Sequence, residues 1–181
     1  MAAKPRKCRH CKAPFVPARP LQVACGYSCA IEVHKANTRR TMAREKRAAR
    51  RRARPRRDWV KLAQTAFNAF VRERDLIMPC ISCHMPVNYN GQWQAGHYRT
   101  TAAAPQLRFD ESNVHRQCAQ CNSSKSGNVV EYRKKLIERV GLLEVERLEN
   151  DNEVKRQTVE ELQAIGKTYR ERLREMRKAR A

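Results

Sequence analysis

Eight cysteines in two spaced sets constrain this chain more than any other feature of its sequence. The first set is Cys8, Cys11, Cys25 and Cys29, and the second is Cys80, Cys83, Cys118 and Cys121. Each set can place four thiolates in a tetrahedron, which is the usual ligand array of a structural zinc ion. We expect metal ligation and not disulfides, because the sequence shows no secretion signal. The chain is therefore predicted to hold two structural zinc ions.

The chain is also strongly basic. Its 181 residues include 39 Lys and Arg against 18 Asp and Glu, which gives a net charge of +21 and a pI near 10.4. Such a charge favours a polyanion, and nucleic acid in particular, as the partner. An anionic membrane would attract the same surface, but no apolar run approaches the roughly 20 residues of a spanning helix. We therefore expect a cytoplasmic protein that binds nucleic acid and no membrane.

A basic run follows the first cysteine set. Residues 32–57 contain only Glu32 and Glu45 as acidic residues, so the run is predicted to be either a solvated helix or a flexible arm that orders on a phosphate backbone. Pro55 should end any helix just before it. The arginines expected to contact DNA here are Arg50, Arg51, Arg52, Arg54, Arg56 and Arg57.

Helical patterns flank the second cysteine set. Asp58 is placed to cap a helix whose apolar residues recur at steps of three and one: Trp59, Leu62, Ala63, Ala66, Phe67, Phe70 and Val71. The phase of its aromatic residues favours core packing over base stacking. A later helix should end at Gly141, and the capping box that starts at Thr158 opens a last helix. That last helix would either pack on the core or form a homodimer.

Polar residues between the second set's two cysteine pairs exceed what a purely structural zinc site needs. The turn Asn90-Gly91 predicts a short hairpin that leads into His97, so His97 should lie on a strand. Asn113 precedes the last cysteine pair and Asn122 follows it directly. Three basic residues in this region are candidate phosphate contacts: Arg99, Arg108 and Lys125.

The run from Asn113 to Lys125, with its Asn-x4-Cys-x-x-Cys-Asn-x-x-Lys pattern, resembles the His-Asn-His (HNH) nucleases and the endonuclease VII type of junction resolvase. The stretch from Arg72 to Phe109 is similar to the lambdoid phage NinG (Rap) recombination endonucleases. The resemblance implies a ββα-metal core in which His97 is the general base, Asn113 a structuring residue and Asn122 a ligand of Mg²⁺ or Mn²⁺.

The same resemblance implies branched recombination intermediates, such as Holliday junctions and D-loops, as substrates. It also implies a phage or prophage gene whose product acts in the bacterial cytoplasm. The expected fold is α+β, with a small zinc-stapled HNH core flanked by helices. Four parts are expected: a zinc knuckle (1–31), a basic helix or arm (32–57), the nuclease core (58–141) and a C-terminal helical segment (142–181).

One position departs from the HNH pattern. Many of these enzymes have an Asp directly before the catalytic His, and this sequence has Gly96 there. Asp110, Glu111 or His115 could supply the missing metal ligand, or water and the DNA phosphate could complete the site. The alternative interpretation is a catalytically inactive, zinc-containing adaptor that binds DNA in recombination. A third class, a ribosome or RNA factor, fits the charge but gives no reason for His97 and Asn122.

Overall fold

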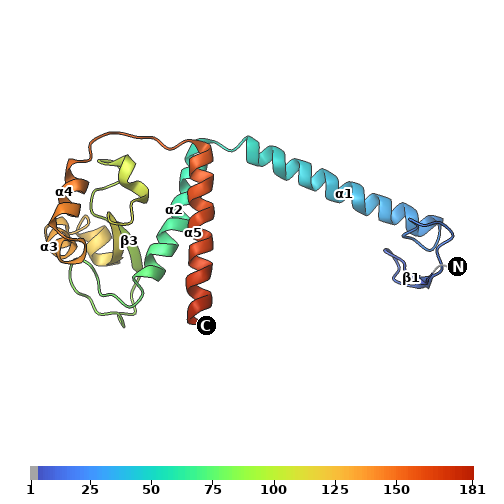
Figure 1. Cartoon of the computed structure of the whole chain (residues 1–181), viewed down its shortest axis with the longest axis horizontal. Helices are drawn as coiled ribbons and strands as arrows, with labels where there is room; N and C mark the ends of the chain where they lie inside the picture. The colour runs from blue at the N-terminus through green and yellow to red at the C-terminus, as the bar shows by residue number, and fades with distance from the viewer. Residues whose placement is uncertain (1–3) are drawn as a thin grey trace. The chain divides into compact units, whose positions relative to one another are not determined.

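The computed structural model describes residues 4–181, which divide into two compact units (Figure 1). The first unit ends at Arg54 and the second spans Pro55–Ala181. Among the described residues, no helix is long and apolar enough to cross a lipid bilayer.

The first unit is a small cysteine knuckle followed by a long helix. Strand β1 (Arg6–Lys7) pairs antiparallel with β2 (Pro14–Phe15), and α1 spans Tyr27–Arg52. The backbone N–H of Cys8 donates to the carbonyl of Ala13, and Lys12 has a positive φ of 63° in the tight turn between them. This turn brings the first cysteine pair together ahead of the helix that carries Cys29.

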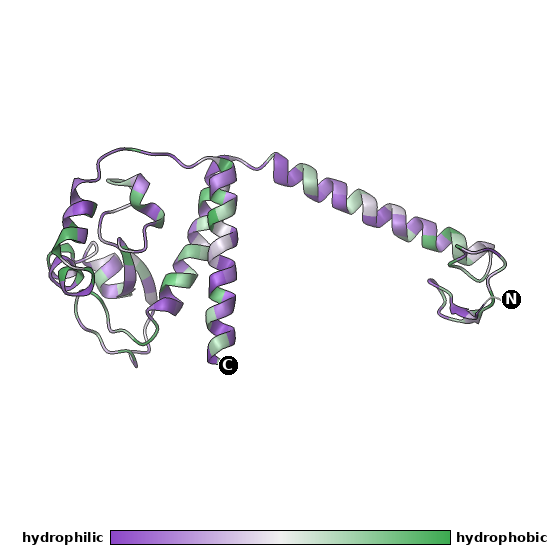
Figure 2. Ribbon diagram, viewed as in Figure 1, coloured by the Kyte–Doolittle hydropathy of each residue, from purple (hydrophilic) through white to green (hydrophobic). Residues whose placement is uncertain are grey.

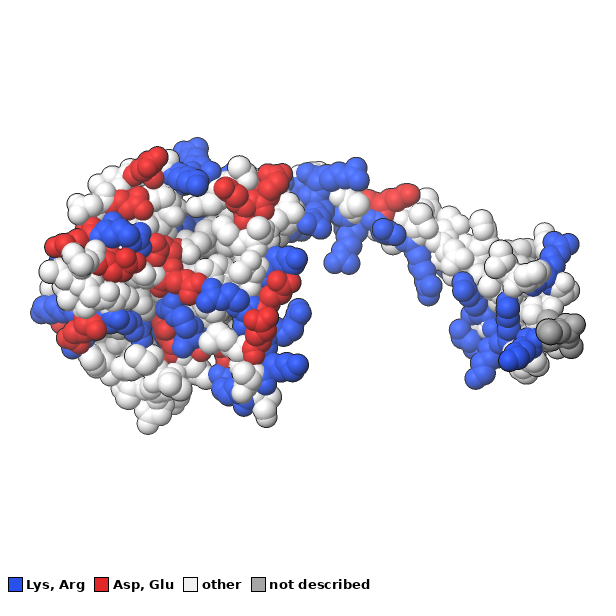
Figure 3. Space-filling view, in the orientation of Figure 1, with Lys and Arg blue, Asp and Glu red and all other residues white. Residues whose placement is uncertain are grey.

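Helix α1 has no buried residue along its length. Of the two forms that the sequence leaves open for the basic run, the structure has the helix, and Pro55 follows its end as expected. Figure 3 shows Lys and Arg side chains along α1 with few acidic side chains among them. Because α1 buries no apolar stripe in this unit, its charged surface is available to solvent or to a partner.

The second unit combines α-helices with one two-stranded sheet and two short helical turns. Its elements are α2 (Arg56–Arg74), β3 (Trp93–His97), the 3₁₀ turn η1 (Pro105–Phe109), β4 (Val114–Cys118), the single wide turn η2 (Gln120–Ser124), α3 (Val129–Val140), α4 (Leu142–Asn150) and α5 (Val159–Arg180). Strands β3 and β4 are antiparallel, with His97 opposite Val114. The unit is therefore a mixed helix and small-sheet fold.

The sheet lies between two apolar clusters. On one side, Phe67 and Phe70 of α2 pack with Ala95 and Val114 of the sheet and with Tyr169 of α5. The other cluster gathers side chains from α3, α4 and the loops: Ile81, Tyr98, Ala104, Leu107, Tyr132, Leu136, Val145 and Leu148. Figure 2 shows the apolar stretches of α2 and α5 where the two helices run side by side. The aromatic stripe of α2 is thus core, as its phase predicts.

Two features of α2 differ from the sequence prediction: the residue at which the helix begins and the exposure of Leu62. The helix begins at Arg56 after Pro55, so Asp58 lies in its first turn and is not its cap. Pro55 is the N-cap residue and is extended, with φ −65° and ψ 150°. Leu62 is 40% exposed, since the buried face runs through Ala63, Ala66 and Phe67.

The predicted hairpin around Asn90-Gly91 is wrong, although His97 does lie on a strand. Strand β3 pairs with β4, which is distant in sequence. Residues 86–92 form turns instead, and Tyr89 and Trp93 stack edge to face at 5.7 Å against the second cysteine cluster. Packing on this cluster overrides the local turn signal.

Candidate active site

Both cysteine sets come together as the spacing predicts. Within residues 4–181, the sulfur atoms of each set lie within 4.8 Å of one another. Cys11 and Cys25 are 3.6 Å apart, and Cys83 and Cys118 are 3.7 Å apart, between sulfurs. Four sulfurs at about 2.3 Å from one zinc ion are about 3.8 Å from each other. Both sets therefore fit zinc, and all eight cysteines are free of disulfides.

His97 is held at the end of β3 by its ring nitrogen Nε2. This atom is 3.1 Å from the backbone carbonyl oxygen of Arg108. A carbonyl can only accept, so Nε2 carries the proton and Nδ1 is left with a lone pair. Burial lowers the pKa of His97 below its ordinary value, and the charge of Arg108 acts in the same direction. The ring is therefore neutral at pH 7, in the form that a general base needs.

Asn113 is fully buried and ties together the segment between the two strands. Its Nδ2 donates to the carbonyls of Arg99 and Leu107 at 3.0 and 3.1 Å, and its Oδ1 accepts from the Arg99 N–H at 2.8 Å. The carbonyl of Asn113 also accepts from the N–H of Tyr98, next to His97. This side chain positions the end of β3 and touches no solvent, as a structuring residue would.

Asn122 lies on η2, next to the last cysteine. Its Nδ2 donates to Oε1 of Gln94 at 2.5 Å, and Ser123 donates its hydroxyl to the same oxygen at 3.1 Å. The Oδ1 of Asn122 faces Gly96: a Cβ added at Gly96 would lie 3.0 Å from this oxygen and would collide with Oε1 of Gln117. Two side-chain oxygens therefore converge on the space beside Gly96, where a side chain has no room.

The three residues that could substitute for an acidic ligand at position 96 all have partners within the protein. Asp110 accepts from the backbone of Ser112 and pairs with Arg147, and Glu111 binds Tyr169 and Arg172. His115 is buried, with Nδ1 3.2 Å from the hydroxyl of Tyr132. The side chains of Asp110 and Glu111 are thus directed to other partners, whereas His115 lies opposite Gly96 in the sheet and its partner Tyr132 donates to the carbonyl of Gly96.

Arg99 and Lys125 take different roles in the structure. The guanidinium of Arg99 donates to the carbonyls of Leu148, Glu149 and Asp151 at 2.9 to 3.0 Å, so it closes the end of α4. Lys125 ends η2, and its side chain is exposed three residues after Asn122. Lys125 therefore stays a predicted phosphate contact, whereas Arg99 donates its hydrogen bonds within the protein.

A basic groove includes Arg108 in its lining. Its volume is about 410 Å³, and in the part of the chain that the structure describes its lining contains six cationic residues and no acidic one. The lining is Arg56, Arg57, Val60, Lys61, Pro105, Arg108, Lys155, Arg156 and Gln157. The carbonyl of Arg108 holds the His97 ring, so the groove and the ring share one residue. Burial lowers the pKa of Arg108, and the charge of Arg56 adds to this effect.

The sequence predicted Arg56, Arg57 and Arg108 as DNA contacts but did not predict the other cations of the groove. Lys61 lies between apolar positions of α2, and Lys155 and Arg156 lie in the linker between α4 and α5. The one available signal was a basic pair in a linker beside a capping box. Folding brings the linker to α2, where Arg56 Nε donates to the carbonyl of Gln157 at 3.0 Å.

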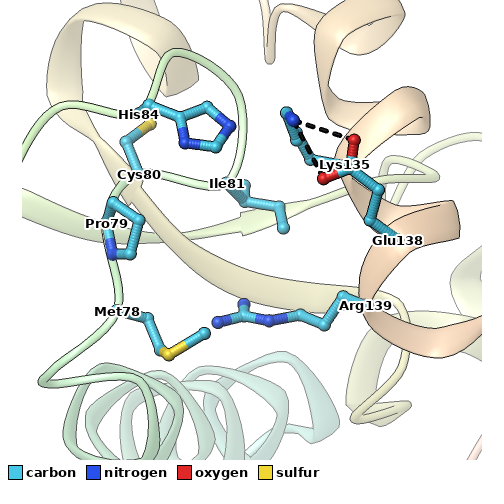
Figure 4. Close-up of a pocket in the computed structure, with 8 residues that line it drawn as sticks. All are labelled: Met78, Pro79, Cys80, Ile81, His84, Lys135, Glu138 and Arg139. Atoms are coloured by element: carbon cyan, nitrogen blue, oxygen red, sulfur yellow. Dashed lines mark hydrogen bonds and ion pairs between the residues drawn. The ribbon is translucent and has the colours of Figure 1, made fainter.

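A second pocket, of about 210 Å³, lies beside the first cysteine pair of the second unit (Figure 4). Its lining is Met78, Pro79, Cys80, Ile81, His84, Lys135, Glu138 and Arg139. Figure 4 shows Lys135 and Glu138 paired with each other and Arg139 directed toward Met78. The pocket contains none of the three residues His97, Asn113 and Asn122, so it is separate from the candidate site.

The fold and the site define an α+β protein with two four-cysteine clusters suited to zinc, a neutral histidine and a basic groove that shares Arg108 with this histidine's hydrogen bond. The family model described as Bacteriophage Lambda NinG protein matches residues 1–179, and the chain belongs to this family. The part of the resemblance that concerns this family is thereby confirmed. The HNH core stays a prediction.

Relatives of similar length support the same assignment. "Protein ninG" of Escherichia phage 933W is 45% identical over 205 aligned residues, which cover 99% of this chain and 98% of that protein. "Protein ninG" of Escherichia phage lambda is 43% identical over 205 aligned residues, 100% of this chain and 98% of that protein. "Protein ninG" of Salmonella phage P22 is 54% identical over 127 residues, which span 70% of this chain and 62% of that protein. No solved structure matches the chain.

Proposed function

We propose that this protein is a metal-dependent endonuclease that hydrolyses phosphodiester bonds in branched DNA. The observation that carries the proposal is the neutral ring of His97, fixed by the carbonyl of Arg108, a residue that also lines a groove of six cations. A structural zinc protein has no need of a desolvated histidine at this position. A nuclease needs a base and a phosphate site side by side.

The chemistry follows from the tautomer of His97. With Nε2 protonated, Nδ1 takes a proton from a water molecule, and the resulting hydroxide attacks phosphorus in line with the 3′ oxygen. The bond to that oxygen breaks and the oxygen takes up a proton from solvent, which leaves a 5′ phosphate and a 3′ hydroxyl end. A hard divalent cation such as Mg²⁺ or Mn²⁺, when bound, would neutralise the charge on the leaving oxygen. The side-chain oxygen of Asn122 is suited to hold such a cation.

The basic groove is suited to the DNA backbone. Phosphates are held by Lys and Arg without regard to sequence, and the six cations that line the groove provide that contact. Zinc in the two thiolate clusters would have a scaffolding role, since four sulfur ligands leave no open position for a substrate.

Branched DNA is the proposed substrate because of the resemblance of residues 72–109 to junction-cleaving recombination endonucleases. A second candidate function is that of a DNA-binding adaptor without catalysis. Gly96, in place of an acidic ligand, is the observation that favours it. Both functions use the basic groove, and they differ in whether Mg²⁺ triggers cleavage.

The test is single-turnover cleavage of a four-way junction and of the matching linear duplex, each with Mg²⁺ or with EDTA. We expect the junction to be cut only with Mg²⁺, and His97→Ala to slow cleavage by about 10²- to 10⁴-fold while DNA binding is retained. Cleavage by His97→Ala at the wild-type rate would overturn the role of His97. A wild-type protein that binds the junction and cuts neither substrate would establish the adaptor.

A further inference from the structure

The space beside Gly96 contains a polar atom whose partner is missing. The Oε1 atom of Gln117 is buried without a hydrogen-bond partner among the residues that the structure describes, and the Gln117 side chain is 0% exposed. A buried carbonyl oxygen without a partner costs free energy, so native proteins rarely leave one in that state. Either a bound water molecule or a bound cation would satisfy this oxygen.

The orientation of the Gln117 amide is set by its other end. Its Nε2 lies 2.7 Å from the hydroxyl oxygen of Ser82 and 2.6 Å from the carbonyl oxygen of Gly127. If the amide were flipped, Oε1 would face the Gly127 carbonyl, and two acceptors would meet without a proton between them. The nitrogen therefore points to Gly127, and Oε1 points to the space beside Gly96.

The oxygen of Gln117 does not stand alone there. The Oδ1 of Asn122 faces the same space, and both oxygens lie within 3.0 Å of the point where a Cβ of residue 96 would be. This is the position from which an acidic side chain before the catalytic histidine would reach a cation. Residue 96 is a glycine because the amide of Gln117 occupies the volume that such a side chain needs.

We infer that Gln117 supplies the cation ligand that position 96 does not, so that the Oε1 of Gln117 and the Oδ1 of Asn122 together hold a divalent cation of the Mg²⁺ class. The inference rests on the proposed function, whose cation it assigns to two residues. Oxygen atoms of amides suit hard cations, whereas the thiolate clusters prefer zinc. Because both ligands are neutral, the free protein should bind the cation weakly, and a DNA phosphate would complete the site.

The first test needs no substitution. Wild-type protein loaded with zinc is titrated with MnCl₂ alone, and the side-chain amide signals of Asn and Gln are followed by ¹⁵N NMR. We expect the Nε2 signals of Gln117 and the Nδ2 signals of Asn122 to broaden first, because Mn²⁺ is paramagnetic and would lie against both amides. Broadening at exposed carboxylates with none at Gln117 would overturn the inference and leave water as the partner of Oε1.

The second test uses a matched pair of variants. Gln117→Met removes Oε1 and keeps an unbranched side chain, whereas Ser82→Ala removes one partner of Nε2 and leaves Oε1 in place. We expect Gln117→Met to weaken Mn²⁺ binding at least about tenfold, and Ser82→Ala to stay within about twofold. Equal Mn²⁺ affinity in wild type and Gln117→Met would contradict the assignment.

A third test introduces a carboxylate ligand at position 96. Gly96→Asp alone should lower the melting temperature, because its Cβ collides with Gln117. The double variant Gly96→Asp with Gln117→Ala has room for the carboxylate, so it should bind Mn²⁺ at least as tightly as wild type. Weaker Mn²⁺ binding by this double variant would count against a cation in this space. Since all these readouts are made without DNA, the cation site can fail while His97-dependent cleavage stands, or stand while cleavage fails.

Discussion

Strand β4 buries three polar side chains in succession, and each must find its hydrogen-bond partners inside the protein. Arg116 donates to the carbonyls of Leu76 and Met78, and its backbone N–H donates to Asp75. Gln117 and His115 are buried on the opposite face of the sheet from Val114. The buried side chains of β4 are therefore partly polar, and the protonation state of His115 among them matters to the stability of the fold.

His115 should make the protein sensitive to acid. Burial lowers the pKa of His115 to about 3, so below pH 6.5 the unfolded chain takes up a proton that the folded chain does not. Stability should therefore fall with pH, by about 2 kcal/mol from this residue between pH 7.5 and pH 5. His115→Asn keeps a donor for the Tyr132 hydroxyl and cannot take up the proton. Urea unfolding at the two pH values should show a loss about 2 kcal/mol smaller in the variant, and equal losses would contradict the argument.

The variants His97→Ala and Asn122→Ala should lose cleavage for different reasons, which a Mn²⁺ titration can separate. His97→Ala removes water activation, so raising the Mn²⁺ concentration should not restore cleavage of a four-way junction. Asn122→Ala removes one oxygen ligand, and high Mn²⁺ should recover part of the rate, because Mn²⁺ binds such sites more tightly than Mg²⁺. The measurement is single-turnover cleavage across a Mn²⁺ titration, with binding checked in parallel. Recovery of His97→Ala by Mn²⁺ would assign His97 to the cation and not to the water.

The sequence predicted single residues well where the chemistry is local and poorly where it depends on what folds against them. That His97 lies on a strand was predicted from a hairpin that the structure lacks, and the structuring role of Asn113 follows from the resemblance to the HNH nucleases. The use of Arg99 does not, because its partners are carbonyls at the end of α4, far along the chain. Likewise Gln117 Oε1 becomes significant only when Ser82 and Gly127 fix the other end of its amide.

At the scale of the elements, α2 and α5 pack closely at one small residue. Gly166 of α5 is buried against Ala63 of α2, and a Cβ added at Gly166 would lie 3.5 Å from the Cα of Ala63. That distance is an ordinary van der Waals contact, and the nearest other atom is the flexible end of Arg170 at 3.2 Å. The crossing therefore has room for one methyl group and not for a larger side chain.

Gly166→Ala should stabilise the protein by about 0.5 to 1 kcal/mol, because alanine has the higher helix propensity and its methyl group fits. Gly166→Leu should destabilise it by about 1 to 3 kcal/mol, since the larger side chain would separate the two helices. Thermal unfolding of the two variants beside wild type gives both signs in one experiment. A destabilised Gly166→Ala would show that the helices are closer than this geometry allows.

Element boundaries could be predicted where a cap or a breaker stands in the sequence. The capping box is present as expected, with Thr158 accepting from the Glu161 N–H and Glu161 accepting from the Thr158 N–H. Gly141 ends α3 with a φ of 86°. The partner of β3 could not be predicted in this way, because Val114–Cys118 follows β3 after residues 98–113, which include η1, and not after a tight turn.

At the scale of the whole molecule, the two cysteine clusters lie in different compact units. Elemental analysis should therefore find two zinc ions per chain. Cys118→Ser should unfold the second unit, because Cys118 lies in the buried strand β4 and metal binding is part of the folding free energy. Cys11→Ser should release one zinc ion and leave the thermal unfolding of the second unit unchanged. A shift of both transitions by Cys11→Ser would show that the units fold together.

The distribution of charge predicts that each unit contributes its own share of the proposed affinity for DNA. Helix α1 carries basic residues along a surface with no buried face, and the basic groove of the second unit has six more cations. Each phosphate contact releases condensed counterions, so the slope of log K against log salt reports how many contacts each unit makes, at about 0.9 per phosphate on duplex DNA. The two contributions can be removed separately.

Deletion of residues 1–54 should weaken DNA binding and flatten its salt dependence, while cleavage at saturating protein persists, because His97 and the groove belong to the second unit. Lys155→Gln with Arg156→Gln should lower the slope by up to about 2 in the full-length chain. These two changes should also slow cleavage at saturating protein, since we propose that this groove, which shares Arg108 with the hydrogen bond of His97, holds the strand to be cut. The measurements are binding to a four-way junction at several salt concentrations and single-turnover cleavage for each protein. An unchanged slope after the deletion would show that α1 does not lie on DNA, and would assign the phosphate contacts to the second unit.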